Sequence, residues 1–385
     1  NNSASYETAY TYNIENQPTQ LRFGADNRKL TYTYDPIGRL YRRVAVGAAN
    51  YTTQYAYFDP DPEDTILTTP LVTSITQNGQ NFSYTYDNVG NITSVTRNGL
   101  TTTYEYDSLG QLTRVNDPHA GKSTMYLYDC GGNMTGYLSA PYTLAPTLEG
   151  VNETVFYTYG DSNWKDKVTA IGGKAITYDA IGNPLTYDGW TFTWKAGRML
   201  ASMVKTGTNA QFTYDHNGMR IRKVVNGVTT NYTLNGKNVV HMTQGSHDLH
   251  FFYDAQGKPG MVTYNDVDYF YVYNLQGDVV ALIDANGTQV VEYGYDAWGN
   301  PISKTGSLAA TIGTLNPFRY RGYVYDEETG LYYLRSRYYN PVWKRFVNAD
   351  HIGERNLFLY CRNSPVFRVD NNGNKSNTCN YPLFQ

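Results

Sequence analysis

The sequence predicts an all-β protein in which consecutive antiparallel β-hairpins pair edge to edge into one long, curling sheet. A recurring unit supports this fold class: an aromatic residue, one spacer, Tyr, and Asp or Asn, followed three or four positions later by Gly. Clear examples run from Tyr32 to Gly38, from Tyr104 to Gly110 and from Tyr293 to Gly299. Many units return after about 20 residues, the length of two strands and two turns. Tyr (39 residues) and Gly (35 residues) are both abundant.

Each unit is expected to form one hairpin. Tyr104 and Tyr106 stand two positions apart, so they point to the same side of a strand and make an aromatic stripe. Asp107 can accept a hydrogen bond from the backbone two residues on, and Gly110 supplies the positive φ that reverses the chain. Leu112 then begins the return strand. Because an isolated hairpin is marginal in water, neighbouring units are expected to bury their stripes together.

Three longer intervals between units are predicted to be loops, at 59–64, 139–150 and 306–315. The first reads Asp59-Pro60-Asp61-Pro62-Glu63-Asp64 and is acidic enough to attract calcium. It lacks the Gly-centred spacing and the closing Glu of an EF-hand loop, so a solvated loop is favoured.

Composition and charge limit the classes of binding partner and the cellular location that can be expected. A net charge of −3 gives no reason to expect nucleic acid or an anionic membrane as partner. No apolar run reaches membrane-spanning length, so no membrane span is expected. Cys130, Cys361 and Cys379 are odd in number and widely spaced, which fits neither a disulfide framework nor a zinc site. The Thr-, Asn- and Tyr-rich β character is typical of secreted and cell-surface proteins.

Few side chains suggest metal or cofactor chemistry. His247 and His250 would point to opposite faces of a strand, so they are not expected to share a metal ion. Ser246, His247 and Asp248 are adjacent in a strand and cannot converge into a triad. No phosphate-binding loop or nucleophile elbow occurs in the sequence. We therefore predict no cofactor and no metal site.

The sequence enters a hairpin soon after Asn1, with no signal peptide and no capping unit before it. We therefore expect an array that is truncated at its N-terminal end. Its open strand edge is an expected docking point for a capping or delivery protein.

From Asn316 onwards the pattern changes to a dense series of motifs. In order they read Asn-Pro-Phe-Arg-Tyr-Arg-Gly-Tyr at 316–323, Tyr-Asp-Glu-Glu-Thr-Gly-Leu-Tyr-Tyr at 325–333, and Arg-Ser-Arg-Tyr-Tyr-Asn-Pro at 335–341, followed by Arg345-Phe346, Asp350 and Asn356-Leu357-Phe358. With the repeats, this order resembles the Rhs/YD-repeat family, which includes bacterial polymorphic toxins, C subunits of insecticidal toxin complexes and animal teneurins.

The resemblance implies a hollow shell of spiralling repeats, with a core that folds inward and plugs one end. It divides the chain into a shell at 1–315, a repeat-associated core at 316–374, and a tail or the start of a variable segment at 375–385. In the toxin members, it implies that the core is an intramolecular aspartyl protease. That protease releases a variable C-terminal toxin inside the shell.

Matched position by position, the family's catalytic Arg and two Asp become Arg337, Asp350 and Asp370, with the cut between Asn374 and Lys375. Two carboxylates brought close share a proton, so one can activate water while the other protonates the amide. Arg337 can hold one carboxylate ionised or stabilise the developing oxyanion. Such a site acts once, on its own chain.

A second interpretation of these residues is structural. Asp350 and Asp370 each stand three residues before Gly, as do most Asp in the repeats, which is typical of turn formers. Arg337 could stack on Tyr338 or Tyr339. The closing box also reads Asp370-Asn371-Asn372-Gly373-Asn374, without the family's Pro and Leu, and His351 replaces a frequent Pro.

The aromatic stripes admit three roles: lining a chamber that holds an unfolded guest, stacking on sugar rings from outside, or packing between neighbouring strands. The predicted function is a secreted or surface shell that encloses and presents its own C-terminal effector segment. Its core is at most a single-turnover aspartyl autoprotease. The alternative is a non-enzymatic adhesion or scaffold protein with the same shell, whose partner is a cell-surface glycan or receptor.

Overall fold

The computed structural model describes residues 7–24, 28–59, 69–351, 356–374 and 376–378 and is almost entirely β. Its main feature is a 28-stranded antiparallel sheet, here called the wall. Its strands are β1 (Thr8–Tyr12), β2 (Pro18–Phe23), β3 (Lys29–Tyr34), β4 (Leu40–Val46), β5 (Asn50–Tyr57), β6 (Val72–Gln77), β7 (Gln80–Tyr86), β8 (Ile92–Arg97), β9 (Leu100–Tyr106), β10 (Leu112–Asp117), β11 (Lys122–Tyr128), β12 (Met134–Pro141), β13 (Glu153–Thr158), β14 (Ala170–Ile171), β15 (Lys174–Tyr178), β16 (Pro184–Tyr187), β17 (Trp190–Lys195), β18 (Met199–Lys205), β19 (Thr208–Tyr214), β20 (Arg220–Val225), β21 (Val228–Asn235), β22 (Asn238–Gln244), β23 (His247–Tyr253), β24 (Pro259–Tyr264), β25 (Val267–Tyr273), β26 (Val279–Asp284), β27 (Gln289–Tyr295) and β28 (Pro301–Thr305).

The remaining elements follow the wall in sequence. They are α1 (Ile312–Leu315), the 3-10 turns η1 (Tyr320–Gly322) and η2 (Cys361–Asn363), a four-stranded sheet of β29 (Val324–Asp326), β30 (Leu331–Tyr333), β31 (Tyr338–Asn340) and β32 (Arg345–Phe346), and a two-stranded sheet of β33 (Arg368–Asp370) and β34 (Ser376–Thr378). The predicted loop at 306–315 thus contains a helical turn, and the start of the 139–150 interval belongs to β12. The acidic 59–64 segment lies mostly outside the described residues.

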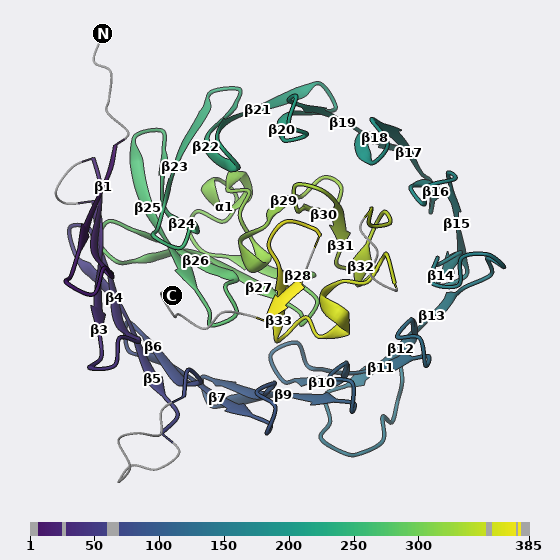
Figure 1. Ribbon diagram of the computed structural model, residues 1–385, viewed down its shortest axis with the longest axis horizontal. Helices are drawn as coiled ribbons and strands as arrows, with labels where there is room; N and C mark the ends of the chain where they lie inside the picture. Colours follow the sequence, from purple (N-terminus) through teal and green to yellow (C-terminus); the bar gives the residue numbers. More distant parts are fainter. Residues whose placement is uncertain (1–6, 25–27, 60–68, 352–355, 375, 379–385) are drawn as a thin grey trace.

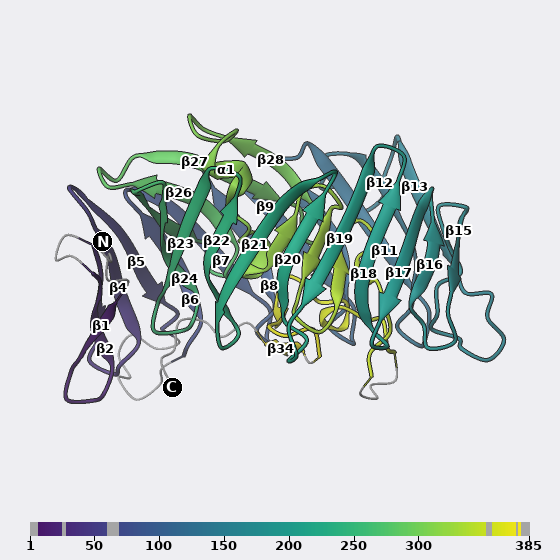
Figure 2. The ribbon, with the colours of Figure 1, turned by 90° about the horizontal axis from the view of Figure 1, so that it is seen from above.

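The wall curves into a ring around the C-terminal elements (Figure 1). Within the described residues, strands pair with their neighbours in the chain, so β1 and β28 are edges and the sheet stays open. Seen from the side, β34 lies toward one rim of the wall (Figure 2). The predicted fold class, a curling antiparallel shell with an inward-folding core, is confirmed. The exact division at residue 315 stays a prediction.

The two ends of the wall overlap face to face. Figure 1 shows β1, β3 and β4 outside β23–β26. Leu21, Phe23 and Leu30 from the first strands form one buried cluster with Phe252 and Met261 from the later strands. The rings of Phe23 and Phe252 lie 5.4 Å apart. In the part of the chain that the structure describes, the edge strands β1 and β28 do not pair with each other. The apolar contact between the first and the later strands therefore joins the two ends of the wall.

The turn chemistry follows the expected local rules. Asp107 Oδ1 accepts hydrogen bonds from the backbone N–H groups of Leu109 and Gln111, both at 2.9 Å. The N–H of Gly110 donates to the carbonyl of Asp107 at 2.9 Å, and Gly110 has a φ of 75°. The predicted Asp–Gly turn of the repeat is therefore confirmed at this position.

The second Tyr of most units joins its hairpin to the preceding one by a hydrogen bond. The hydroxyl of Tyr106 donates to the carbonyl of Ile92, the first residue of β8, at 2.8 Å. The same bond, to the start of the preceding return strand, is made by Tyr34, Tyr57, Tyr86, Tyr128, Tyr159, Tyr214, Tyr253, Tyr273 and Tyr295. A phenol thus satisfies a backbone acceptor that Phe would leave without this donor. We call this series the phenol ladder.

Several aromatic residues of the wall face inward. Tyr126 meets Trp298, in the turn between β27 and β28, edge-on at 5.7 Å. The hydroxyls of Tyr214 on the wall and Tyr338 in the core lie 2.8 Å apart. Tyr157 donates to the carbonyl of Trp343. These residues do not supply the outward aromatic surface that the adhesion alternative needs.

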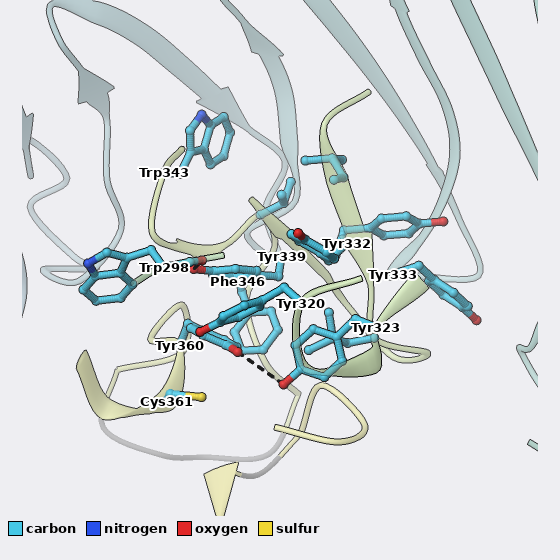
Figure 3. Close-up of a cluster of buried hydrophobic side chains, with 14 of the residues drawn as sticks. Trp298, Tyr320, Tyr323, Tyr332, Tyr333, Tyr339, Trp343, Phe346, Tyr360 and Cys361 are labelled. Atoms are coloured by element: carbon cyan, nitrogen blue, oxygen red, sulfur yellow. Dashed lines mark hydrogen bonds between the residues drawn. The ribbon is translucent and has the colours of Figure 1, made fainter. Parts of the chain in front are cut away.

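The centre of the core is a cluster of stacked aromatic rings (Figure 3). Tyr339 stacks on Tyr360 with ring centroids 3.9 Å apart, and the hydroxyls of Tyr360 and Tyr323 lie 3.2 Å apart. Tyr320 and Tyr332 complete the cluster, with centroids 6.0 Å apart. All five rings are buried, so the core has a packed aromatic interior.

Lys344 is a buried cation between the core and the wall. Its side chain is 7% exposed, and Nζ lies 3.8 Å from the centroid of the Tyr137 ring on β12. Burial lowers the pKa of Lys344 to about 8, although Asp296 opposes the shift. The charged form therefore costs stability at neutral pH.

Lys344→Met is expected to stabilise the protein by about 1–3 kcal/mol at pH 7. The folded pKa of about 8 lies below the reference value of 10.5, so the folded state binds fewer protons between these values. Wild-type stability should rise with pH across this window, and the advantage of the variant should shrink. Thermal denaturation from pH 7 to pH 10 measures the difference. Lys174→Met is the control, because that side chain is 55% exposed; an advantage of Lys344→Met that does not change with pH would contradict the prediction.

Candidate functional site

Arg337, Asp350 and Asp370 meet in the core. Arg337 directly precedes β31, Asp350 follows β32, and Asp370 ends β33. Arg337 Nη2 lies 3.0 Å from Asp350 Oδ2 and 3.7 Å from Asp370 Oδ2. All three side chains are buried, with exposed fractions of 5% for Arg337 and Asp350 and 2% for Asp370. The structure therefore gathers the three predicted site residues around one guanidinium.

Each carboxylate uses its two oxygens differently. Asp370 Oδ1 accepts from the N–H groups of Gly373 and Asn372, at 2.7 and 3.2 Å, while Oδ2 faces Arg337. Asp350 Oδ1 accepts from the N–H of His351 at 2.7 Å, and its Oδ2 also faces Arg337. For Asp370 the turn-forming interpretation is thus compatible with a shared site, because one oxygen binds the backbone of the turn and the other faces Arg337. Residues 352–355, which contain the expected turn of Asp350, lie outside the described residues.

Arg337 is held in place on several sides. Its guanidinium carbon lies 3.5 Å from the centroid of the Phe346 ring. The sequence had suggested Tyr338 or Tyr339 as the aromatic partner instead. Nη1 donates to the carbonyl of Leu357 at 3.0 Å, and Nε donates to the carbonyl of Gly373. Arg337 therefore contacts both carboxylates and also the backbone just before the predicted cut.

The segment of the predicted cut passes directly by this site. Asp370 pairs with Ser376 in the β33–β34 hairpin, and the described residues 371–374 follow β33 on the side of its turn. Gly373 has a φ of 78°, and a Cβ there would lie 2.6 Å from Ser336 Oγ and 3.0 Å from the carbonyl oxygen of Leu334. Only glycine fits this close approach. Asn374 is described, whereas Lys375 and the predicted tail lie outside the described residues, apart from 376–378.

A cavity of about 10 Å³ adjoins the three side chains. It is lined by Arg337, Asp350, Asn356, Leu359, Arg362, Asp370, Asn374 and Ser376. Such a volume is close to the space that one water molecule needs. The arrangement can therefore place a water beside two carboxylates, a guanidinium and Asn374.

Sequence reasoning missed two groups of residues. Asn356 and Arg362 line the cavity. Asn356 was part of the Asn356-Leu357-Phe358 motif but was given no role, and Arg362 belongs to none of the motifs. His241, Asp248 and His250 meet on the wall. From the sequence, only His247 and His250 were considered as a pair of metal ligands. A register prediction for the hairpin around Gly245 would have brought His241 opposite His250, as the structure does.

No helix within the described ranges combines the length and apolar character that a membrane crossing requires.

Comparison with known proteins gives consistent matches. The family model described as Teneurin YD-shell matches residues 77–372. The tRNA3(Ser)-specific nuclease WapA of Bacillus spizizenii is 36% identical over 262 residues, which cover 64% of this chain and 11% of WapA. The toxin subunit YenC1 of Yersinia entomophaga is 24% identical over 389 residues, covering 89% of this chain and 36% of YenC1. The chain thus spans a minor part of these relatives.

Solved structures share the fold at low identity. A TcdB2-TccC3-Cdc42 crystal structure superposes with a TM-score of 0.71 at 18% identity, over 95% of this chain and 20% of that chain. A structure of the Photorhabdus luminescens Tc holotoxin pore gives a TM-score of 0.65 at 17% identity, over 97% of this chain and 22% of that chain. Both likenesses concern the arrangement of the wall and the core.

Proposed function

The chain belongs to the Teneurin YD-shell family, and on this basis we propose that its wall encloses a C-terminal effector that the core releases by one cut after Asn374. One observation carries the proteolytic step. Asp350 and Asp370 turn one oxygen each toward Arg337, and the same Arg337 holds the carbonyl of Gly373, next to the residue that would be cut. A structural ion pair alone needs neither the second carboxylate nor this backbone contact.

The enclosing role is supported by the ring shape and by the relatives. WapA carries the name of a nuclease and YenC1 that of a toxin subunit, and each extends far beyond the region shared with this chain. We infer that the shared region serves as a container for a variable part. The protein would act outside the cell or on its surface, and the exposed edge of β1 would bind a capping or delivery protein.

The proposed cleavage is a hydrolysis. One carboxylate, in its ionised form, takes a proton from water, and the resulting hydroxide oxygen attacks the carbonyl carbon of Asn374. Arg337 stabilises the oxyanion, and the other carboxyl group gives its proton to the nitrogen of Lys375 as the C–N bond breaks. The products are a new carboxyl terminus at Asn374 and a new amino terminus at Lys375.

Cleavage can be tested on the full-length protein by denaturing electrophoresis and mass spectrometry. The unmutated protein should run as two bands, with one fragment ending at Asn374. Asp350→Asn and Asp370→Asn should each leave a single band, because each removes one of the two proton-transfer groups. Asp188→Asn, at an exposed pair with Lys174, should still cleave. Gel filtration and circular dichroism would check that every variant is folded.

A single band from the unmutated, folded protein would eliminate the protease and leave the container. Cleavage that persists in both folded variants would assign the two carboxylates to turn formation only, and cleavage that persists in one of them would contradict a role of that carboxylate in proton transfer.

A further inference from the structure

Two histidines and an aspartate converge on the hairpin of β22 and β23. His241 on β22 and His250 on β23 are directly paired in the strand register. Asp248 stands two positions before His250 and therefore on the same face. Asp248 Oδ2 lies 3.0 Å from His241 Nε2, and its Oδ1 lies 2.8 Å from His250 Nε2. Both imidazoles thus direct the same nitrogen toward one carboxylate.

The imidazole rings of His241 and His250 lie nearly parallel to each other. The two imidazole rings are stacked, with centroids 4.2 Å apart and planes inclined by 13°. The exposed fractions of the side chains are 28% for His241, 47% for Asp248 and 19% for His250. These residues therefore form a partly sheltered cluster that solvent ions can reach.

This cluster lies on the face of the hairpin away from the core. Met242 and Leu249, the sequence neighbours of His241 and His250, belong to the buried cluster on the inner face. Side chains alternate along a strand, so the two histidines face outward. The site is thus distinct from Arg337, Asp350 and Asp370, which lie in the core.

We propose that His241, Asp248 and His250 bind a divalent transition-metal ion, with Zn²⁺ as the first candidate. One ligand atom from each residue lies within 4.8 Å of the others, a spacing that small side-chain rotations can convert into coordination of one ion. Two imidazole nitrogens and one carboxylate oxygen are the donors that such ions favour. The ion would displace the hydrogen bonds between the rings and the carboxylate.

The surroundings leave room for the remaining ligands. A groove of about 560 Å³ lies beside the cluster and is lined by His241 and His250, and also by Thr8 and Tyr10 of β1. Three protein ligands with an open position are typical of zinc sites that also bind water or another small ligand. The ion would cross-link the β22–β23 hairpin close to the place where the first strand lies over it.

The test uses untagged full-length protein, stripped of metal by a chelator and titrated calorimetrically with ZnCl₂. One Zn²⁺ should bind per chain, and Zn²⁺ should raise the melting temperature, since it binds the folded state. His241→Ala and His250→Ala should each weaken binding by about 100-fold or more, as loss of a direct ligand exceeds the effect of outer-shell changes. Co²⁺ bound in place of Zn²⁺ should show a visible spectrum that both variants lose.

His247→Ala is the matched control on the same hairpin. His247 Nδ1 lies 2.9 Å from the Tyr264 hydroxyl, and this residue is not in the cluster. Its removal should leave Zn²⁺ binding unchanged. Melting temperatures of the metal-free variants would show that each is folded. Absence of stoichiometric binding to the unmutated protein, or unchanged binding in both His241→Ala and His250→Ala, would overturn the proposal.

Discussion

Asp326→Ala is expected to lower the free energy of unfolding by about 3–5 kcal/mol, because it leaves buried Arg220 without its carboxylate and leaves buried Lys223 with Glu328 alone. Asp326 on β29 is fully buried and lies 2.5 Å from Arg220 Nη1 and 3.1 Å from Lys223 Nζ, both on β20. Burial alone would raise the pKa of Asp326, but Arg220 and Lys223 outweigh it and hold the pKa below its ordinary value. This ion cluster is a polar connection between the core and the wall.

The acid dependence of this effect has a definite sign. Because the folded pKa of Asp326 is lowered, its contribution is fully present above the unfolded value of 3.8 and is lost as the pH falls through the folded value. The difference between the unmutated protein and Asp326→Ala should therefore be larger at pH 7 than in strong acid.

Urea denaturation at pH 7, followed by tyrosine and tryptophan fluorescence, measures the shift. Asp188→Asn is the control, since the Lys174–Asp188 pair has the same chemistry with side chains 55% and 38% exposed, and Asn tolerates the left-handed backbone of this turn. Exposed pairs contribute about 0–1 kcal/mol, so the control should change little. Equal shifts for Asp326→Ala and Asp188→Asn would show that the buried cluster does not hold the core to the wall.

Gly299→Ala is the second substitution with a large expected effect, at about 2–5 kcal/mol of destabilisation. Gly299 closes the turn after β27 with a φ of 84°, and a Cβ at this position would overlap the ring of Tyr320. Tyr320 is 2% exposed and belongs to the aromatic centre of the core (Figure 3). The substitution would therefore push the core away from the wall.

Gly110→Ala separates the cost of the left-handed backbone from the cost of the overlap with Tyr320. Gly110 occupies the same position in its turn, with a φ of 75°, and no atom lies within 4 Å of the place that an added methyl group would take. It should cost only about 1–2 kcal/mol for the left-handed backbone. Thermal melting of both variants compares them directly, and a Gly299→Ala variant as stable as Gly110→Ala would contradict the close approach to Tyr320.

The hairpins could be predicted from the sequence because their determinants are local. Asp107 and Gly110 lie within one turn, and Tyr104 and Tyr106 within one strand, so nearest-neighbour chemistry suffices. The order of motifs after Asn316 then identified the family. The inward position of the core followed from that resemblance, since no local pattern encodes where a segment packs.

The site could be predicted only in part, because its contacts are long-range. Arg337, Asp350 and Asp370 come from three separate segments, and chemistry alone gave no reason to choose them among the many Asp before Gly. Phe346 under Arg337 and the Arg220–Asp326 pair, 106 residues apart, depend on the packing of the core against the wall. His241 and His250 needed the register of one hairpin.

The phenol ladder has a consequence for how such molecules vary in size. Each phenol of the ladder finds its acceptor at the start of the preceding return strand, so its hairpin carries the donor and the hairpin before it carries the acceptor. Gain or loss of a whole hairpin preserves this match, whereas gain of a single strand would leave one partner missing. The length of the wall can therefore change in steps of one hairpin without leaving a phenol or its acceptor in the ladder without its partner.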